Sequence, residues 1–477
     1  MERPLSSLVQ TPSRSRISNL FALIKEAVLG SRQDFTAISV DRSIILLAVP
    51  MVLEMAMESL FGIVDIFFVA HLGADATATV GITEGMLVIV MAFAVGLSMG
   101  ATAVVARRTG EHDKDGAAQA AVQAIFLGLL IAVLIFSLCL PFAPRLLALM
   151  GAGPEILHIG STYSRIMMSA SGTILMLFLI NGIFRGAGDA AVAMRVLWVA
   201  NLINICLDPC LILGLGPFPK LGVTGAAVST TIGRSVGFLF QVYLLWKGTD
   251  RMRIARRHLR VYLGVMRNII KIAGNGVLQF LIATASWVLM VRMVQSFGSA
   301  ATAGYTVAIR IVIFSILPSW GLSTAAATLV GQNLGARQPE RAEQAVWRAG
   351  FFNMIFLGGL SVVFLALAPQ LVGIFSHDPV VIRYGANCLR IISLCYGLYA
   401  YGLIVVQAFN GAGDTFTPSM INLFCYWVVQ LPLAFLLGRR MALGPNGIYL
   451  AVLATETLLA LIAIYVFRLG RWKRTVV

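Results

Sequence analysis

The chain has 477 residues, of which 58% are hydrophobic and 12% are charged. A soluble domain carries about 25% charged residues, so this composition excludes a soluble enzyme or binding domain and indicates a polytopic membrane protein. The formal net charge of +15 does not indicate nucleic-acid binding, because the basic residues gather in alternate loops and at the two ends of the chain.

Long apolar segments follow one another along nearly the whole chain. A membrane-spanning helix needs about 20 apolar residues, and a helix satisfies its backbone hydrogen bonds internally, as the bilayer requires. We therefore predict an all-α fold with twelve transmembrane helices. In chain order, the expected spans are 43–69, 79–105, 117–140, 157–182, 192–214, 223–246, 268–294, 303–330, 343–367, 383–409, 417–437 and 446–468.

The spans divide the chain into two lobes joined by a basic linker. We expect an N-terminal tail at 1–42 without a cleaved signal peptide, an N-lobe of six helices at 43–246 and a linker at 247–267. A C-lobe of six helices at 268–468 and a short tail at 469–477 complete the chain.

Basic residues concentrate in both tails, in the linker and in every second loop. This is the positive-inside pattern. It predicts that both termini and the linker are cytoplasmic and that the protein lies in the plasma (inner) membrane. The linker is expected to rest on anionic headgroups, so membrane lipids are expected partners.

The two halves of the sequence repeat each other. GLSMGATAVVARRTGEHD (96–113) resembles GLSTAAATLVGQNLGARQ (321–338), and FRGAGDA (184–190) resembles FNGAGDT (409–415), each at an offset of 225 residues. Because each half holds an even number of spans, both halves run the same way across the membrane. Parallel repeats are a transporter architecture, with the substrate site between the halves.

Three acidic residues, Glu54, Glu58 and Asp65, lie within the first predicted span. At about 100° per residue, all three fall on one stripe of the helix. A carboxylate at the bilayer centre costs about 2.5–3.5 kcal/mol on insertion scales, and such residues usually line a cavity or an ion path. We expect Asp65 to take part in cation or proton coupling, and Glu54 and Glu58 to extend an acidic path.

The fifth predicted span carries a second polar group, Asn204 and Asp208, followed by Pro209. Residues four apart share a helix face, and Pro209 deprives the carbonyl four residues earlier of its hydrogen-bond donor. We predict a proton or ion site beside a hinge. The alternative is that Asn204 and Asp208 satisfy each other in the bundle core.

These acids belong to the first repeat alone. The residues 225 positions after Asp65, Asn204 and Asp208 are Met290, Val429 and Leu433. A purely structural role would not require this asymmetry. We therefore expect the coupling chemistry in the N-lobe.

The sequence indicates no catalytic or metal site. The six cysteines all fall in apolar segments and none is spaced with a histidine for metal binding. A membrane enzyme would need a nucleophile with its base, or a metal cluster, at one depth, and we find neither. We expect no enzyme activity and no cofactor besides a coupling ion, H⁺ or Na⁺.

From about residue 43 to 468 the chain resembles the multidrug and toxic compound extrusion (MATE) transporters. The resemblance rests on Pro50 with VDIFFVAHLG (64–73), the repeated GLS and GAGD motifs, and NICLDP (204–209) followed by LGVTGAAVSTTIG (221–233). It implies a V-shaped cavity between two six-helix lobes.

The resemblance also implies roles for particular residues. The family's N-lobe coupling positions match Asp65, Asn204, Asp208 and, in the sixth span, Thr230. Pro50 matches a first-span proline associated with bending. The seventh and tenth spans lack the acids of one branch of the family, so the chain looks similar to the DinF-like branch.

The resemblance implies a secondary active antiporter that exports cationic amphipathic compounds in exchange for protons or sodium ions by alternating access. We expect it to act as a monomer. The alternative is a lipid-linked oligosaccharide flippase of related fold. A flippase binds an anionic pyrophosphate and would need Arg and Lys in its cavity, whereas the predicted lining here is acidic.

Overall fold

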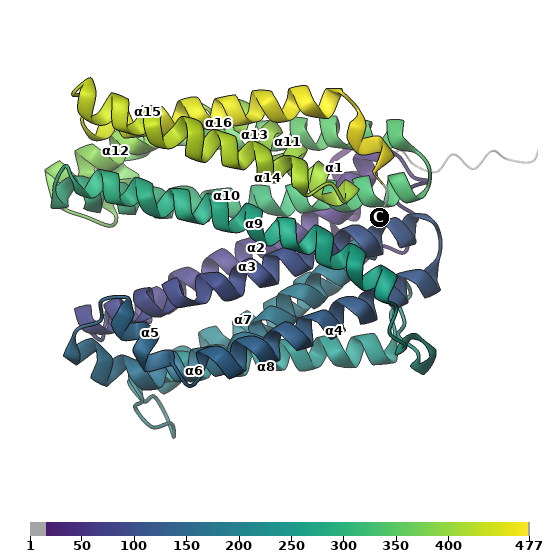
Figure 1. Cartoon of the computed structure of the whole chain (residues 1–477), viewed down its shortest axis with the longest axis horizontal. Helices are drawn as coiled ribbons and strands as arrows, with labels where there is room; N and C mark the ends of the chain where they lie inside the picture. The colour runs from purple at the N-terminus through teal and green to yellow at the C-terminus, as the bar shows by residue number, and fades with distance from the viewer. Residues whose placement is uncertain (1–15, 476–477) are drawn as a thin grey trace, which may run out of the picture.

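In a computed structural model the chain is described from residue 16 to residue 475, and every regular element in that range is helical (Figure 1). Residues 1–15 of the predicted N-terminal tail and 476–477 of the C-terminal tail lie outside the described part. The elements are α1 (Arg16–Leu29), α2 (Val40–Ala70), α3 (Ala74–Gly110), α4 (Lys114–Cys139), α5 (Ala143–Leu149), α6 (Pro154–Gly186), α7 (Ala190–Leu213), α8 (Val223–Lys247), η1 (Arg256–His258), α9 (Leu263–Gln295), α10 (Ser299–Gly335), α11 (Pro339–Gly373), α12 (Pro379–Ser393), α13 (Tyr396–Ala412), α14 (Phe416–Asn422), η2 (Leu423–Gln430), α15 (Leu431–Phe435), η3 (Leu436–Arg440), α16 (Pro445–Arg468) and η4 (Arg471–Arg474).

Each of the twelve predicted spans corresponds to a helical segment. In the described range, ten segments are long and apolar enough to cross a membrane. An eleventh is the pair α12 and α13, bent by 62°, so the tenth predicted span is not one continuous helix. The sixth predicted span, α8, is not among these segments, and it packs against α6 and α7.

The eleventh span also departs from a regular α-helix. It runs from 416 to 440 as α14, η2, α15 and η3, and both η2 and η3 are π-helical. Pro432 lies between the two π-helical segments and donates no backbone hydrogen bond, which interrupts the α-helical pattern at this point.

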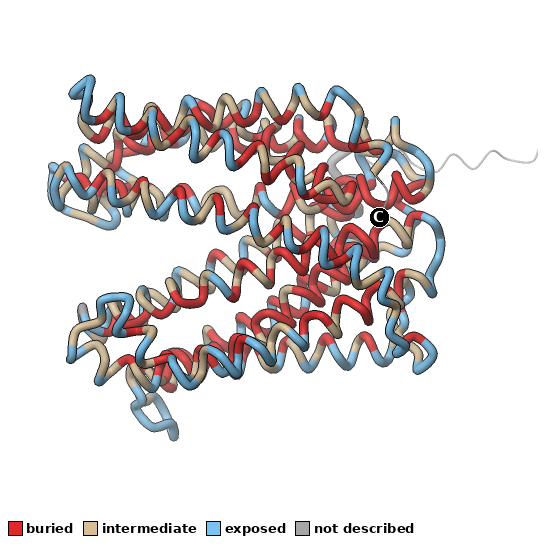
Figure 2. The backbone as a smooth tube through the Cα atoms, viewed as in Figure 1, coloured by how far each residue is buried: buried red, intermediate tan, exposed pale blue. Residues whose placement is uncertain are grey.

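The helices form two lobes in a V-shaped arrangement. α2 to α8 make one lobe and α9 to α16 the other (Figure 1). The lobes meet at the end that holds α1 and the C-terminus, which we call the closed end, and they separate toward the opposite, open end. Buried residues concentrate at the closed end, whereas the tips at the open end are largely exposed (Figure 2).

At the closed end, two helices cross from one lobe into the other. α2 packs against α10 of the C-lobe, and α9 packs against α3 of the N-lobe. Residues of α2 such as Leu47 and Met51 share a buried cluster with the C-lobe, and Ile269 and Ala273 of α9 share one with the N-lobe. Since α9 and α10 repeat α2 and α3, the two crossings are equivalent.

Glycines allow this close approach. A Cβ at Gly110 would lie 1.9 Å from the carbonyl oxygen of Gln332, and a Cβ at Gly335 would lie 2.1 Å from that of Arg107. Both distances are far below van der Waals contact. Gly335 and Gln332 are the repeat equivalents of Gly110 and Arg107, so the ends of α3 and α10 contact each other through matching positions.

Two arginines fasten the segment between α1 and α2 across the closed end. Arg251, in the linker, donates to the carbonyl of Gln33 at 2.6 Å. Arg341, on α11 of the C-lobe, donates to the carbonyls of Phe35, at 3.0 Å, and Ile38. The chain before the first span is therefore bonded both to the linker and to the C-lobe.

Candidate functional site

α7 and α8 bring three of the predicted coupling residues together in the N-lobe. Asp208, Asn204 and Thr230 are all buried. Asn204 donates through Nδ2 to Asp208 Oδ1 at 3.3 Å and to Thr230 Oγ1 at 3.1 Å. Gly233 makes this packing possible, because a Cβ there would lie 2.5 Å from the carbonyl oxygen of Ala200 on α7.

Ser229 belongs to the same cluster and was missed by the sequence analysis. Its hydroxyl donates to Asp208 Oδ1, and Asn204 Nδ2 lies 3.4 Å from its Oγ. Asp208 Oδ2 and Asn204 Oδ1 remain buried without a hydrogen-bond partner in the described structure. Two acceptor oxygens are thus free for a proton or a cation.

Asp65, on α2, is half-buried and its Oδ1 is buried without a hydrogen-bond partner among the described residues. It interacts electrostatically with Asp208 and with Glu84 of α3, both of like charge, and with Arg234. Asp65 therefore adds a second incompletely satisfied carboxylate to the same electrostatic neighbourhood.

Glu54, in contrast, has a cationic partner, although its Oε2 atom is buried without a hydrogen-bond partner in the described structure. It is buried and pairs with Arg185 of α6 at 2.9 Å, and it accepts a hydrogen bond from Asn181 at 3.1 Å. Gln241 of α8 in turn donates to Asn181 Oδ1 at 2.7 Å. This network ties α2, α6 and α8 together.

Glu58 is also neutralised by an arginine. It pairs with Arg234 of α8 at 2.6 Å and accepts from Asn201 of α7 at 3.0 Å. The guanidinium of Arg234 lies 4.8 Å from the ring centre of Phe61. The part of Glu54 and Glu58 in an acidic path stays a prediction, since both are found in ion pairs.

The proposed hinge residues lie inside helices. Pro50 is buried within α2, four residues before Glu54, and Pro209 lies within α7, directly after Asp208. Pro50 leaves the carbonyl of Leu46 without its helical donor, and Pro209 does the same to Ile205, one turn earlier in α7. Their role as hinges stays a prediction.

Departures from repeat symmetry would have identified the missed partners. Arg234 aligns with Leu459 in the second repeat, and Asn181 aligns with Val406. The polar group is therefore specific to the N-lobe across α6 and α8 as well as α2 and α7. No cluster of His, Cys, Asp or Glu suited to a metal ion occurs within residues 16–475.

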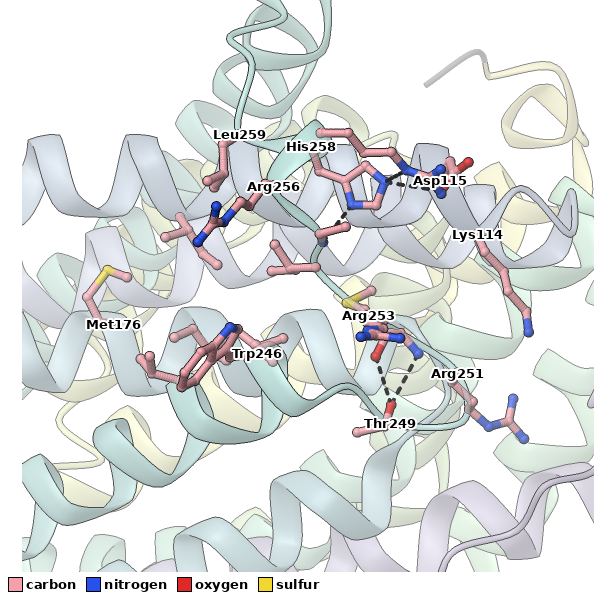
Figure 3. Close-up of a pocket in the computed structure, with 18 of the residues that line it drawn as sticks. Lys114, Asp115, Met176, Trp246, Thr249, Arg251, Arg253, Arg256, His258 and Leu259 are labelled. Carbon is pink, nitrogen blue, oxygen red and sulfur yellow. Dashed lines mark hydrogen bonds and ion pairs between the residues drawn. The ribbon is translucent and has the colours of Figure 1, made fainter.

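A separate cavity of about 970 Å³ lies where the linker meets the N-lobe (Figure 3). Arg253 and Arg256 line it and form no ion pair within the described chain. Trp246, Met176 and Leu129 contribute to an apolar part between α4, α6 and α8. The cavity thus combines positive charge with an apolar wall.

Polar contacts anchor the linker beside this cavity. Thr249 donates to Asp189 Oδ2 at 2.5 Å, and Arg251 Nε lies 3.8 Å from Asp189 Oδ1. Burial raises the pKa of the Asp189 carboxyl, against the opposing hydrogen bond from Thr249 and the charge of Arg251. Burial likewise lowers the pKa of the Arg251 guanidinium.

The chain matches known proteins over most of its length. The family model described as MatE matches residues 50–210 and 277–436, one segment in each repeat. The "Probable multidrug resistance protein NorM" of Thermotoga maritima is 25% identical, with 92% of this chain and 94% of that protein covered. The "FAD transporter" of Shewanella oneidensis is 26% identical, covering 85% and 89%.

Solved structures also match the fold of this chain. A structure described as the outward-facing conformation of a multidrug resistance MATE family transporter superposes with a TM-score of 0.87 at 26% identity. The match covers 92% of this chain and 98% of that one.

Proposed function

Because this chain belongs to the MatE family of membrane transporters, we propose that it is a secondary active antiporter that exports cationic amphipathic compounds in exchange for protons or sodium ions. The observation that carries this proposal is the contrast among the N-lobe acids. Glu54 and Glu58 are each paired with an arginine, whereas Asp65 and Asp208 form no ion pair among the described residues. Asp65 and Asp208 each also keep a buried oxygen without a hydrogen-bond partner, as Glu54 does at Oε2.

In this mechanism Asp65 and Asp208 bind one positive charge at a time. With both carboxylates ionised, their mutual repulsion favours a cation between them. Asn204 and Thr230 supply further oxygen atoms beside Asp208. A proton or sodium ion arriving from outside replaces the exported cation, and a monovalent ion gains about 2.3 kcal/mol per 100 mV of membrane potential on entering.

The acidic site favours cationic cargo over anionic cargo. A pyrophosphate carrier or a carrier of FAD needs basic groups for its phosphates, and the arginines nearest this site, Arg185 and Arg234, are already paired with glutamates. Anionic nucleotide export is the competing hypothesis, since one relative is named a FAD transporter.

We further propose that the closed end faces the cytoplasm of a cell with this protein in its inner membrane. The basic linker and the C-terminus lie at that end (Figure 1), and the positive-inside rule puts such segments in the cytoplasm. The V then opens outward, in a state ready to release cargo. A single chain suffices, because all the coupling residues lie in one lobe.

Membrane lipid is the partner we assign to the linker cavity. Arg253 and Arg256 suit an anionic headgroup, and the wall around Trp246 suits an acyl chain (Figure 3). Each basic residue near an anionic surface contributes about 1 kcal/mol. The double variant Arg253→Gln/Arg256→Gln should therefore bind phosphatidylglycerol roughly 30-fold more weakly, measured by native mass spectrometry. Arg260 and Arg267 lie outside the cavity lining. An equal loss of binding in Arg260→Gln/Arg267→Gln would show that general surface charge, not this cavity, binds the lipid.

The function itself is tested by dye export from proteoliposomes with proton and sodium gradients imposed separately. We expect an inwardly directed gradient of one of these ions to drive export of a cationic dye, and FAD to be left unmoved. Export that ignores both gradients, or gradient-driven export of FAD in place of the dye, would overturn the proposal.

A further inference from the structure

The C-lobe contains a cavity that the proposed coupling mechanism does not use. Its volume is about 430 Å³, within the range of small-molecule pockets. It is formed by residues of α9, α10, α12, α13, η2 and α16. Aromatic side chains are prominent in its lining: Phe280, Trp287, Tyr305, Trp320, Tyr396, Tyr399 and Tyr426.

Glu456, on α16, is the one charged side chain in this lining. Its Oε2 atom is buried and has no hydrogen-bond partner in the described structure. Its carboxyl interacts with the hydroxyl of Tyr426 through a hydrogen bond. No Lys, Arg or His lines the cavity. An unneutralised acid therefore lies among aromatic rings, whereas Glu54 and Glu58 of the N-lobe are paired with arginines.

The position of this cavity matches that of the N-lobe site. α9, the segment 416–440 and α16 are the repeat equivalents of α2, α7 and α8, which carry the N-lobe cluster. Glu456 aligns with Thr231 and Thr455 with Thr230. The second repeat thus has its own polar group on the helix equivalent to α8, although it lacks acids at the positions of Asp65 and Asp208.

We propose that this cavity is a second binding site, specific for a small organic ammonium ion, with Glu456 as its counter-ion. The inference rests on the proposed function in one respect, namely that cations are the cargo. Trp287 and Trp320, which are 45% and 42% exposed, lie on α9 and α10, and both helices contact the N-lobe. We place the entrance of the C-lobe cavity at these two side chains.

The chemistry of the lining selects an organic cation over a metal ion. Aromatic faces attract ammonium groups, by about 0.5–2 kcal/mol per interaction, and they accommodate alkyl substituents without loss. A sodium ion instead requires a shell of oxygen ligands. The lining offers the carboxylate of Glu456, the amide of Gln430, already an acceptor for Ser286 at 3.1 Å, and otherwise only the hydroxyls of Thr284 and of its tyrosines. One negative charge among aromatic faces matches an ammonium ion better than a sodium ion.

The test is equilibrium binding of radiolabelled tetraethylammonium to the full-length protein in nanodiscs, without any ion gradient. Glu456→Gln removes the counter-ion and keeps the shape, and it should weaken binding at least about 10-fold. Trp320→Leu should weaken binding about 5-fold and serves as a second variant should Glu456→Gln fold poorly. Glu340→Gln, which changes an exposed acid in the first turn of α11, is the matched control and should leave the affinity unchanged.

Each outcome separates this site from the N-lobe site. Unchanged binding by both Glu456→Gln and Trp320→Leu, or no binding by the wild type, overturns the inference. A loss in Asp208→Asn as large as that in Glu456→Gln would place the ligand in the N-lobe and overturn it as well. Binding that depends on Glu456 stands even if export proves independent of ion gradients, so the two proposals fail separately.

Discussion

Acidic side chains of the N-lobe differ chiefly in what neutralises them. Glu54 and Glu58 each have an arginine within 3 Å. Asp208 has only neutral donors, Ser229 and Asn204. A charge with a fixed counter-ion serves structure, whereas a carboxylate held by neutral groups can change its bound ion without disrupting the fold.

The Glu54–Arg185 pair should therefore matter for stability. Removing one partner of a buried ion pair costs about 3–5 kcal/mol because the other charge stays buried. Glu54→Gln should lower the apparent melting temperature in detergent markedly, and Glu54→Gln/Arg185→Gln should recover part of it. Glu111→Gln breaks only the exposed pair with Arg108 and should change the apparent melting temperature little. Equal effects of the two single substitutions would contradict this assignment.

Ser229 should affect coupling rather than stability. A hydrogen bond to a charged group contributes about 1.5–3 kcal/mol, so Ser229→Ala should shift the coupling-ion concentration for half-maximal export about 10-fold. Thr231→Ala is the control, since its hydroxyl bonds only to the carbonyl of Ala227 within α8. The role fails if both variants retain the wild-type ion dependence in proteoliposomes.

Among individual side chains, the acids were predictable from the sequence but their partners were not. The stripe of Glu54, Glu58 and Asp65 follows from helix geometry alone. Arg185 and Arg234 lie more than 100 residues from their glutamate partners in the sequence. A single sequence does not show which distant residues come together in the fold. The asymmetry between the repeats was the signal available.

Among the helices, the crossing of α3 and α10 at the closed end is the feature most dependent on individual residues. Gly110 and Gly335 contact backbone atoms of the opposite lobe. Backbone cannot move aside as a side-chain tip can, so a single methyl group at either position forces the two helices apart.

Gly110→Ala should therefore destabilise the closed end and raise the accessibility of residues buried there. Gly358→Ala, in α11, adds the same methyl group where no other atom lies within 4 Å, so it should behave as the wild type. Hydrogen exchange of the C-terminal turns of α3 and α10 would measure the difference. Matching exchange in the two variants would show that the lobes pack less tightly than described.

The helices and their division into two repeats were largely predictable from hydropathy and the 225-residue offset, whereas the crossings of α2 with α10 and of α9 with α3 were not predicted. The bend between α12 and α13 was not, since no proline or glycine lies at Leu394 or Cys395. Neither was the π-helical part of the eleventh span. Pro432 marks an interruption in the eleventh span, but the π-helical form on either side of it does not follow from the proline alone.

For the whole molecule, the closed end must open if the transporter is to alternate. Arg341 bonds the chain before α2 to the C-lobe, and the burial there (Figure 2) indicates that this end is the more stable of the two. Opening requires these contacts to break while the opposite tips come together.

Arg341→Gln should shift the population toward opening at the closed end. Spin labels at 111 and 338, beside α3 and α10, should move apart, and labels at 75 and 299, near the open tips, should approach. The six native cysteines would first be replaced. Unaltered distances at both pairs would exclude Arg341 as a lock.

Gradient-driven export by the asparagine variants of Asp65 and Asp208 tests whether these two residues carry the coupling ion. The assay compares Asp65→Asn and Asp208→Asn with Asp75→Asn, an exposed acid in the first turn of α3, in proteoliposomes with equal protein content. We predict that both site variants lose export driven by the proton or sodium gradient while Asp75→Asn retains it. Undiminished gradient-driven export by both Asp65→Asn and Asp208→Asn would show that neither residue carries the coupling ion.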